Sequence, residues 1–196
     1  MRSYKALAIL LSYPQPRWLE ALGEVDEVLR RELLRNRGAA RRVEPLMTHL
    51  RTASVIDAQA HYVQVFDNTP EHSLHLFEHL HGESRDRGQA MVELTGEYRR
   101  YGLQLSCREL PDHLPVYLEF LAQLPAREAG RRLGQFVDVL ALLGSGLSTA
   151  QSPYAGVLQA LTRMAKGRRR GIASAPPAAG AGIAMHAMGQ VRGEYS

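Results

Sequence analysis

The sequence contains a single cysteine, which excludes a fold held together by internal disulfides. Cys107 has no partner in the same chain. The chain has 196 residues, 45% of them hydrophobic, which is enough apolar material to build one core without disulfides or structural metals. We therefore expect a protein of a reducing compartment, the cytoplasm, in which Cys107 is an ordinary buried thiol.

Long hydrophobic runs are also missing. No stretch approaches the roughly 20 apolar residues that a membrane span requires. Near the N-terminus, Arg2 and Lys5 precede a short apolar run over residues 6–11. This run is shorter than a signal-peptide core, and no cleavage site of small residues follows it. We expect a first helix there, with Ser3 as its N-cap, and no stable membrane association.

Motifs for nucleotide binding and for nucleophilic catalysis are absent as well. The sequence has no P-loop, no G-x-G-x-x-G after a strand and no G-x-S-x-G. Ser84 and Ser106 have no surrounding motif, and the proximity of Cys107 to His113 in sequence does not make a dyad. The sequence therefore predicts no cofactor and does not favour catalysis by these groups.

Basic charge is concentrated at one end of the chain. Residues 163–196 hold six arginine or lysine residues against Glu194 alone, so the preceding residues are slightly acidic despite a total formal charge of +4. A basic body that would bind nucleic acid is therefore not indicated. The run KGRRRG over 166–171 leaves contact with nucleic acid or an anionic membrane as an alternative, although such runs are more often solvated.

Apolar residues recur at helical spacing along most of the chain, and alternating strand patterns of any length are missing. This pattern predicts an all-α, single-domain helical bundle over residues 1–166. The stripes are Trp18, Leu22, Val25, Leu29 and Leu33; Val43, Leu46, Met47 and Leu50; Tyr62, Val63 and Phe66; Met91, Leu94, Tyr98 and Tyr101; Tyr117, Phe120, Leu121 and Leu124; Leu133, Phe136, Val137, Leu140 and Leu147; and Tyr154, Val157, Leu158 and Leu161.

Local signals mark several ends of these segments. Ser54 or Asp57 is placed to start one helix, and Gly102 is placed to end another. From Gly167 the composition changes to glycine, alanine and proline with basic residues and no helical stripe. We expect residues 167–196 to be a disordered basic tail.

The stretch LFEHLHGESRDRGQAM, residues 76–91, is dense in ionisable groups. With His75 it contains the order H-x-x-E-H, which on a helix would place His75 and His79 one turn apart with Glu78 as a base. A metal-dependent hydrolase is the alternative function that this pattern suggests. It lacks an identifiable third ligand, as does a second arrangement of His79, His81 and Glu83. We therefore expect no metal site.

A different interpretation of this stretch is a helix end followed by a polar connection. Leu76, Phe77 and Leu80 would anchor the helix, and Ser84 or Asp86 would cap the next one. In the second dense stretch, RELPDHLPVYLEFLAQLP over 108–125, two prolines precede a helix. Asp112 is placed as its N-cap, with His113 at the helix start. An open helix start of this kind could also receive basic residues of a peptide.

These two stretches, together with LLSYP and DAQAHYVQVFD upstream, resemble the NarJ family within the TorD-like group of redox-enzyme maturation proteins. The resemblance runs from about residue 4 to about residue 162, and the tail departs from it. It implies an all-helical, non-enzymatic assembly chaperone for respiratory nitrate reductase. Such a chaperone binds the apo catalytic (alpha) subunit, chiefly its N-terminal signal-like segment, and supports insertion of molybdenum cofactor and iron–sulfur clusters before membrane docking.

The resemblance also implies which residues bind the peptide. Asp112 and Glu83 would pair with peptide cations, and Phe77, Tyr62 and Phe66 would form apolar walls. The residues that match the family's signatures complete the predicted site: His79, His81, Arg85, Asp86, Arg87, Pro111 and His113. The implied partners are the catalytic subunit and the cofactor insertion machinery, with no nucleic acid.

Overall fold

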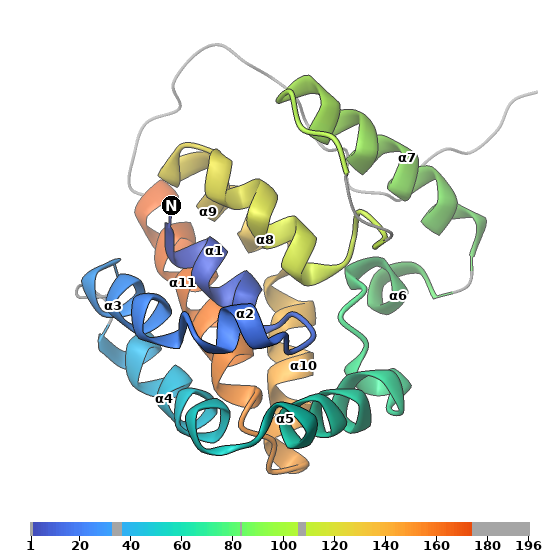
Figure 1. Ribbon diagram of the computed structural model, residues 1–196. Coiled ribbons are helices and arrows are strands. Elements are labelled where there is room, and N and C mark those ends of the chain that lie inside the picture. The colour runs from blue at the N-terminus through green and yellow to red at the C-terminus, as the bar shows by residue number, and fades with distance from the viewer. Residues whose placement is uncertain (1, 33–36, 83, 106–108, 174–196) are drawn as a thin grey trace, which may run out of the picture.

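The computed structural model describes residues 2–32, 37–82, 84–105 and 109–173, and these are almost entirely helical (Figure 1). Within these residues the only strand-like pairing is an isolated bridge between His75 and His113, so the all-α prediction is confirmed. The elements are α1 (Arg2–Leu10), α2 (Pro16–Leu19), α3 (Leu22–Glu32), α4 (Arg37–Thr52), α5 (Val55–Tyr62), the π-helical turn η2 (Val63–Asp67), the 3-10 turn η3 (Pro70–His72), α6 (Leu76–His81), α7 (Arg85–Arg100), α8 (Leu114–Gln123), α9 (Ala126–Leu133), the 3-10 turn η4 (Gly134–Phe136), α10 (Val137–Thr149) and α11 (Ala155–Ala173).

The helices pack around a single apolar core. The pairs α10 with α11, α11 with α4, and α1 with α8 make the most extensive contacts. In Figure 1, α10 and α11 run through the middle of the molecule, while α7 lies at its upper right edge. The largest fully buried side chains are Tyr4, Leu7, Leu10, Leu11, Leu46, Met47, Leu76, Tyr98, Leu114, Leu118, Leu121 and Tyr154.

Most of the predicted apolar stripes face this core, as expected from their spacing. Trp18, Val63 and Met91 are half-buried. Tyr101 was expected in the core and is 43% exposed. Its hydroxyl donates to Glu128 Oε1 at 2.6 Å, so a polar partner at the surface holds it there. Leu33 and Cys107 lie outside the described residues.

The contact between α4 and α11 depends on a glycine. A Cβ atom added to Gly156 would overlap the carbonyl oxygen of Arg42. The two backbones therefore approach more closely here than any side chain would allow, and only glycine fits at this position of α11. The side chain of Arg42 also donates to Gln159 Oε1 at 2.7 Å.

Two helix ends follow the sequence prediction. Ser54 caps α5, because its hydroxyl oxygen accepts the N–H of Asp57 at 3.1 Å. Gly102, with φ of 73°, ends α7: its N–H donates to Arg99 O at 2.9 Å, and the N–H of Leu103 donates to Tyr98 O at 3.0 Å. This pair of bonds is a Schellman motif, which requires the left-handed conformation that glycine adopts readily.

The predicted cap of α1 is wrong. Ser3 lies inside the helix, and the N–H groups of Arg2 and Ser3 instead donate to the two carboxylate oxygens of Glu32, at 2.9 and 2.7 Å. Glu32 is the last residue of α3. These bonds lower the pKa of Glu32 although burial acts in the opposite direction. A carboxylate distant in sequence thus satisfies the first turn of α1.

At the other end of the described chain, α11 continues to Ala173. The backbone is therefore helical beyond residue 166, where the sequence predicted the end of the bundle, and residues 174–196 of the predicted tail lie outside the described residues. None of the helices in the described residues is both long enough and apolar enough to cross a membrane.

Candidate functional site

The two dense polar stretches meet in the folded chain. The N–H of Leu76 donates to Asp112 O at 3.1 Å, and the N–H of Leu114 donates to Leu74 O at 2.8 Å. This short bridge joins the start of α6 to the start of α8. We call residues 74–77 with residues 112–114 the α6–α8 junction.

Asp112 is the central side chain of the junction. It is completely buried, its Oδ2 accepts the N–H of Phe77 at 3.0 Å, and its Oδ1 lies 3.2 Å from Nδ1 of His75. The prediction that Asp112 caps α8 is wrong, because His113 occupies that position and no side chain bonds to the first turn. The carboxylate caps α6 instead, since the bridge brings its free N–H groups within reach.

The two histidines beside Asp112 have opposite pKa shifts. Their rings lie 5.1 Å apart. The hydrogen bond to Asp112 raises the pKa of His75, whereas burial, reinforced by the neighbouring His75, lowers the pKa of His113 to about 4. Nδ1 of His113 has no hydrogen-bond partner among the described residues, and the carboxylate of Glu109 lies 3.7 Å from it. His113 is therefore neutral near pH 7.

The H-x-x-E-H residues do not converge on one point. His75 precedes α6, so it does not share a helical face with His79 as expected. His79 Nε2 lies 2.8 Å from Ser73 O, and Glu78 pairs with Arg87 at 2.9 Å and accepts from the Ser73 hydroxyl. Each group thus has its own partner, and no group of three potential metal ligands occurs within the described residues.

The connection from α6 to α7 follows the predicted outline in part, because Leu80, expected to anchor α6 in the core, is 49% exposed. Gly82 ends α6 with φ of 55°, and α7 begins after Ser84, whose side chain makes no capping bond. Arg85 and Asp86 are exposed, while Arg87 holds α7 against Glu78. Glu83, the other predicted partner for cations, lies outside the described residues.

The predicted apolar walls are core residues with an aromatic extension toward the surface. Tyr62 and Phe66 are buried, and Phe66 contacts the rings of Tyr62 and Tyr154 at centroid distances of 4.8 and 4.9 Å. Tyr62 also meets Tyr13 edge-on at 5.6 Å. Tyr13 is 43% exposed, so it presents this aromatic cluster to solvent.

Phe77, His81 and Pro111 support the junction from within. The buried ring of Phe77 packs on Phe136 at 6.1 Å and on half-buried His81 at 5.7 Å. Buried Pro111 accepts the hydroxyl of Tyr98 at 2.7 Å through its carbonyl oxygen, which ties α7 to the start of α8. These residues support the junction, and of the three only His81 is partly open to solvent.

A second ionic cluster fixes α7 to α9. Arg132, buried in α9, pairs with Glu97 of α7 and lies 3.0 Å from Glu128 Oε1. Its guanidinium also lies over the ring of Phe120, 5.5 Å from the centroid. These ionic partners raise the pKa of Arg132 although burial acts in the opposite direction. A buried charge with several partners holds the helices in one arrangement.

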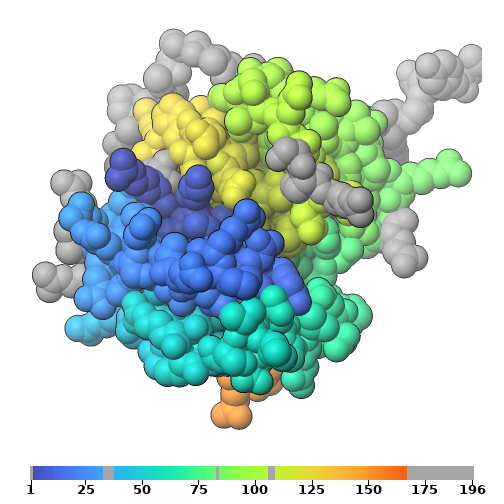
Figure 2. Space-filling model, viewed as in Figure 1, coloured from blue at the N-terminus to red at the C-terminus, as the bar shows by residue number. Residues whose placement is uncertain are grey.

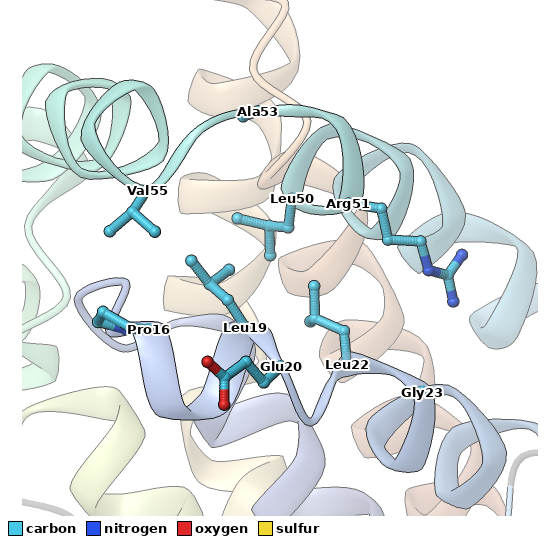
Figure 3. Close-up of a pocket in the computed structure, with 9 residues that line it drawn as sticks. All are labelled: Pro16, Leu19, Glu20, Leu22, Gly23, Leu50, Arg51, Ala53 and Val55. Atoms are coloured by element: carbon cyan, nitrogen blue, oxygen red, sulfur yellow. The ribbon is translucent and has the colours of Figure 1, made fainter.

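A hollow of about 440 Å³ with a mixed polar and apolar lining lies elsewhere, between the α2–α3 connection and the α4–α5 connection (Figure 3). The side chains of Leu19, Leu22, Leu50 and Val55 converge on it, while Arg51 extends away from it in this view. None of the predicted site residues lines this hollow.

The sequence interpretation missed three residues of the junction and its surroundings. Glu109 lies within the RELPDH motif and approaches His113, yet it was not singled out. Tyr13 follows the first apolar run and exposes the aromatic cluster. Ser73 bonds to Glu78, but nothing in the local pattern indicates this contact.

Comparisons with known proteins give a consistent result. The family model described as "Nitrate reductase delta subunit" matches residues 34–160. The chain is 44% identical over 156 residues to the nitrate reductase molybdenum cofactor assembly chaperone NarJ of Escherichia coli (strain K12). It is 41% identical over 169 residues to the probable nitrate reductase molybdenum cofactor assembly chaperone NarW of the same organism. A probable NarJ chaperone of Bacillus subtilis (strain 168) is 29% identical over 162 residues.

The extent of these matches differs between the relatives. The matched region covers 80% of this chain but 66% of the Escherichia coli NarJ chain. It covers 84% of this chain and 68% of NarW, and 81% of this chain and 85% of the Bacillus subtilis protein. The chain therefore spans about two thirds of the length of the two Escherichia coli relatives.

Proposed function

Because the chain belongs to the nitrate reductase delta subunit family, we propose that it is an assembly chaperone for a respiratory nitrate reductase and not an enzyme. The observation that carries the proposal is the α6–α8 junction. It joins the two stretches on which the family resemblance rests, although they lie far apart in sequence. A buried, fully bonded Asp112 is suited to holding a surface in shape for a partner.

The proposed partner is the apo catalytic (alpha) subunit, bound through its N-terminal signal-like segment. The exposed aromatic ring of Tyr13 and the carboxylates near His113 would contact an amphipathic, basic peptide. The chaperone would act in the cytoplasm and hold the subunit while molybdenum cofactor and iron–sulfur clusters are inserted. It would leave before the enzyme docks at the membrane, and it would need no cofactor of its own.

A metal-dependent hydrolase is not supported by the site. His75, Glu78 and His79 each bond to a different group, so a bound metal would have to displace all three interactions. Zinc analysis of the purified chain by mass spectrometry tests this alternative. Stoichiometric zinc would revive it.

The proposed function is tested by calorimetric titration of the full chain with the N-terminal peptide of the host's nitrate reductase catalytic subunit. A scrambled peptide of the same composition is the control. We expect saturable binding of the true peptide and much weaker binding of the scrambled one. Equal binding of the two peptides, or none, would contradict the proposal.

Loading of the enzyme is a separate readout. In cells that lack the chaperone gene, the molybdenum content of the purified nitrate reductase should be low, and the wild-type chain should restore it. The same molybdenum content with and without the chain would show that the chain is not needed for cofactor insertion into this enzyme.

A further inference from the structure

Two histidines away from the α6–α8 junction face each other from two helices. His49 lies in the last turn of α4, and His61 lies in the last turn of α5. Nε2 of His49 is 3.0 Å from Nδ1 of His61, and the rings meet edge-on with their centroids 4.7 Å apart. Both side chains are half-buried. Figure 2 shows the chain around α4 and α5, in cyan and teal, as part of the outer surface along the lower edge of the molecule. The pair is therefore within reach of a small solute.

Without a ligand the two rings share one hydrogen bond. One facing nitrogen donates and the other accepts, because each neutral imidazole has one N–H and one lone pair. Burial, and after it the neighbouring His49, lowers the pKa of His61, so the His61 ring is neutral near pH 7. Neutral imidazole is the form that ligates metal ions. When the donor's proton moves to the remote nitrogen of the same ring, both facing nitrogens present a lone pair.

The spacing of these two nitrogens suits two bonds to one metal ion. Metal–imidazole bonds are about 2.0–2.1 Å long. Two such bonds at a right angle place their nitrogens about 2.9 Å apart, and at the tetrahedral angle about 3.3 Å apart. The observed 3.0 Å is closer to the right angle, which is typical of square-planar and tetragonal Ni²⁺ and Cu²⁺. Tetrahedral Zn²⁺ fits this spacing less well.

The surroundings hold the rings in place and favour a cation. The ring of Tyr154 packs on His61 with the centroids 5.6 Å apart, which limits rotation of the imidazole. The C-terminal end of α4 adds partial negative charge beside His49. Burial raises the pKa of Tyr154, so its phenol keeps its proton and is not a ligand. No third His, Cys, Asp or Glu joins the pair within the described residues, so water would fill the other positions around an ion.

We propose that His49 and His61 form a two-imidazole site for a divalent ion of the Ni²⁺ or Cu²⁺ type, which links the end of α4 to α5. The site is separate from the H-x-x-E-H pattern, whose members each bond to another group. It does not rest on the proposed function, because the chain alone supplies both ligands.

The test is a calorimetric titration of the full chain, without a polyhistidine tag, with Ni²⁺ at neutral pH. Wild type is compared with His49→Gln, His61→Gln, the double variant and His79→Gln. His79 is half-buried like the pair and belongs to the H-x-x-E-H pattern, so its variant is the matched control and also reports any metal held there.

Wild type should bind about one Ni²⁺ per chain. Each single substitution at the pair should weaken binding at least about tenfold, because the ion then loses the second of two linked bonds. The double variant should bind little more weakly than either single variant, since the two ligands act as a unit. Ni²⁺ should raise the thermal midpoint of wild type and of His79→Gln, but not that of the pair variants, because the ion binds only the folded site. A histidine pair with a purely structural role would not produce this metal-dependent difference.

Three outcomes would overturn the inference: no Ni²⁺ binding by wild type, undiminished binding by the double variant, or loss of binding in His79→Gln. If a substitution at the pair prevents folding, electron paramagnetic resonance of wild type with less than one equivalent of Cu²⁺ is the second measurement. The spectrum should show two coordinated imidazole nitrogens, and a single one would contradict the site. The peptide titration is independent of these results, so the proposed function is judged separately.

Discussion

The α4–α11 contact and the α6–α8 junction hold the chain together in different ways. At Gly156 two helices touch backbone to backbone, and this contact is possible only because glycine has no side chain. At Asp112 two segments are joined by hydrogen bonds to one buried carboxylate. The first contact depends on shape and tolerates no added atom. The second depends on polar groups and tolerates an isosteric change that keeps an acceptor.

This difference matters for the proposed function. A close-packed helix pair forms a rigid frame, since interiors transmit any change in volume. A junction made from one carboxylate, two histidines and a short bridge lies next to exposed groups such as Glu109. Under the proposed function, it would position a surface for the partner at the edge of the frame. Four predictions probe the contrast, from the largest expected effect to the smallest.

The largest effect is expected at the shape-dependent contact. Gly156→Ala places a methyl group on the carbonyl oxygen of Arg42, so α11 must move away from α4. We expect the free energy of unfolding to fall by roughly 3 kcal/mol or more, or the chain to fail to fold. Gly96→Ala, in α7 with nothing near its added Cβ, is the matched control and should stabilise by about 0.5–1 kcal/mol. Urea denaturation measures both, and equal stability of the two variants would contradict the close approach.

Asp112→Ala should be the next most damaging. It leaves the N–H of Phe77 and the ring of His75 without their shared acceptor, and we expect a loss of about 2–3 kcal/mol. Asp112→Asn retains one acceptor oxygen and should lose about half as much. Urea denaturation of both variants at pH 7 checks the order. An alanine variant as stable as the asparagine variant would show that the capping bond contributes nothing.

The histidines of the junction predict a pH dependence of stability. An unfolded histidine takes up a proton near its ordinary pKa of 6.5, while His113 stays neutral in the folded chain until about pH 4. Its stabilising contribution is therefore complete above pH 6.5 and is lost as the pH falls toward 4. His75 has a raised pKa, so its contribution is present below 6.5 and is lost as the pH rises through its folded value.

The measurement is the free energy of unfolding at pH 6.5 and at pH 5. Wild type should lose about 1.5 kcal/mol more than His113→Gln over this interval, since the cost rises to about 1.4 kcal/mol per pH unit once the unfolded ring is fully protonated and the folded ring is still neutral. His61, whose pKa burial also lowers, remains in both proteins and cancels in the comparison. Identical pH profiles for the two proteins would show that His113 is not held neutral in the folded chain.

The smallest effect separates a cap distant in sequence from a local one. Glu32→Ala removes the acceptor for the first two N–H groups of α1 and should cost about 1 kcal/mol. Ser84→Ala removes a side chain that makes no capping bond to α7, so it should change stability by less than about 0.5 kcal/mol. Thermal denaturation of the two variants under the same conditions compares the two losses of stability. A larger loss for Ser84→Ala would contradict the observed caps.

Much of the fold was predictable because its signals are local. Apolar side chains recur every three or four residues, and this spacing indicates helices whatever they pack against. Ser54 and Gly102 act on their own helices, so their roles were also predictable. Tyr101 follows the helical spacing but is exposed, because its hydroxyl donates to Glu128, which lies 27 residues away in sequence.

The candidate site was predictable in composition but not in geometry. The resemblance identified Asp112, His113 and Phe77 as important together, and the structure joins them. Their roles were misassigned: Asp112 caps the helix that starts at Leu76, not the one that follows it in sequence. The peptide-binding roles of these residues and of Glu83, Arg85 and Asp86 stay predictions.

The sequence by itself determined the helical class, the positions of most helices and the membership of the family, because each depends on local spacing or on residues in a fixed order. Only the tertiary structure decided which carboxylate caps which helix. Both Glu32 and Asp112 bond to N–H groups at least 29 residues away. A free N–H at a helix start can donate to any acceptor that packing brings close, so sequence distance carries no information about that choice.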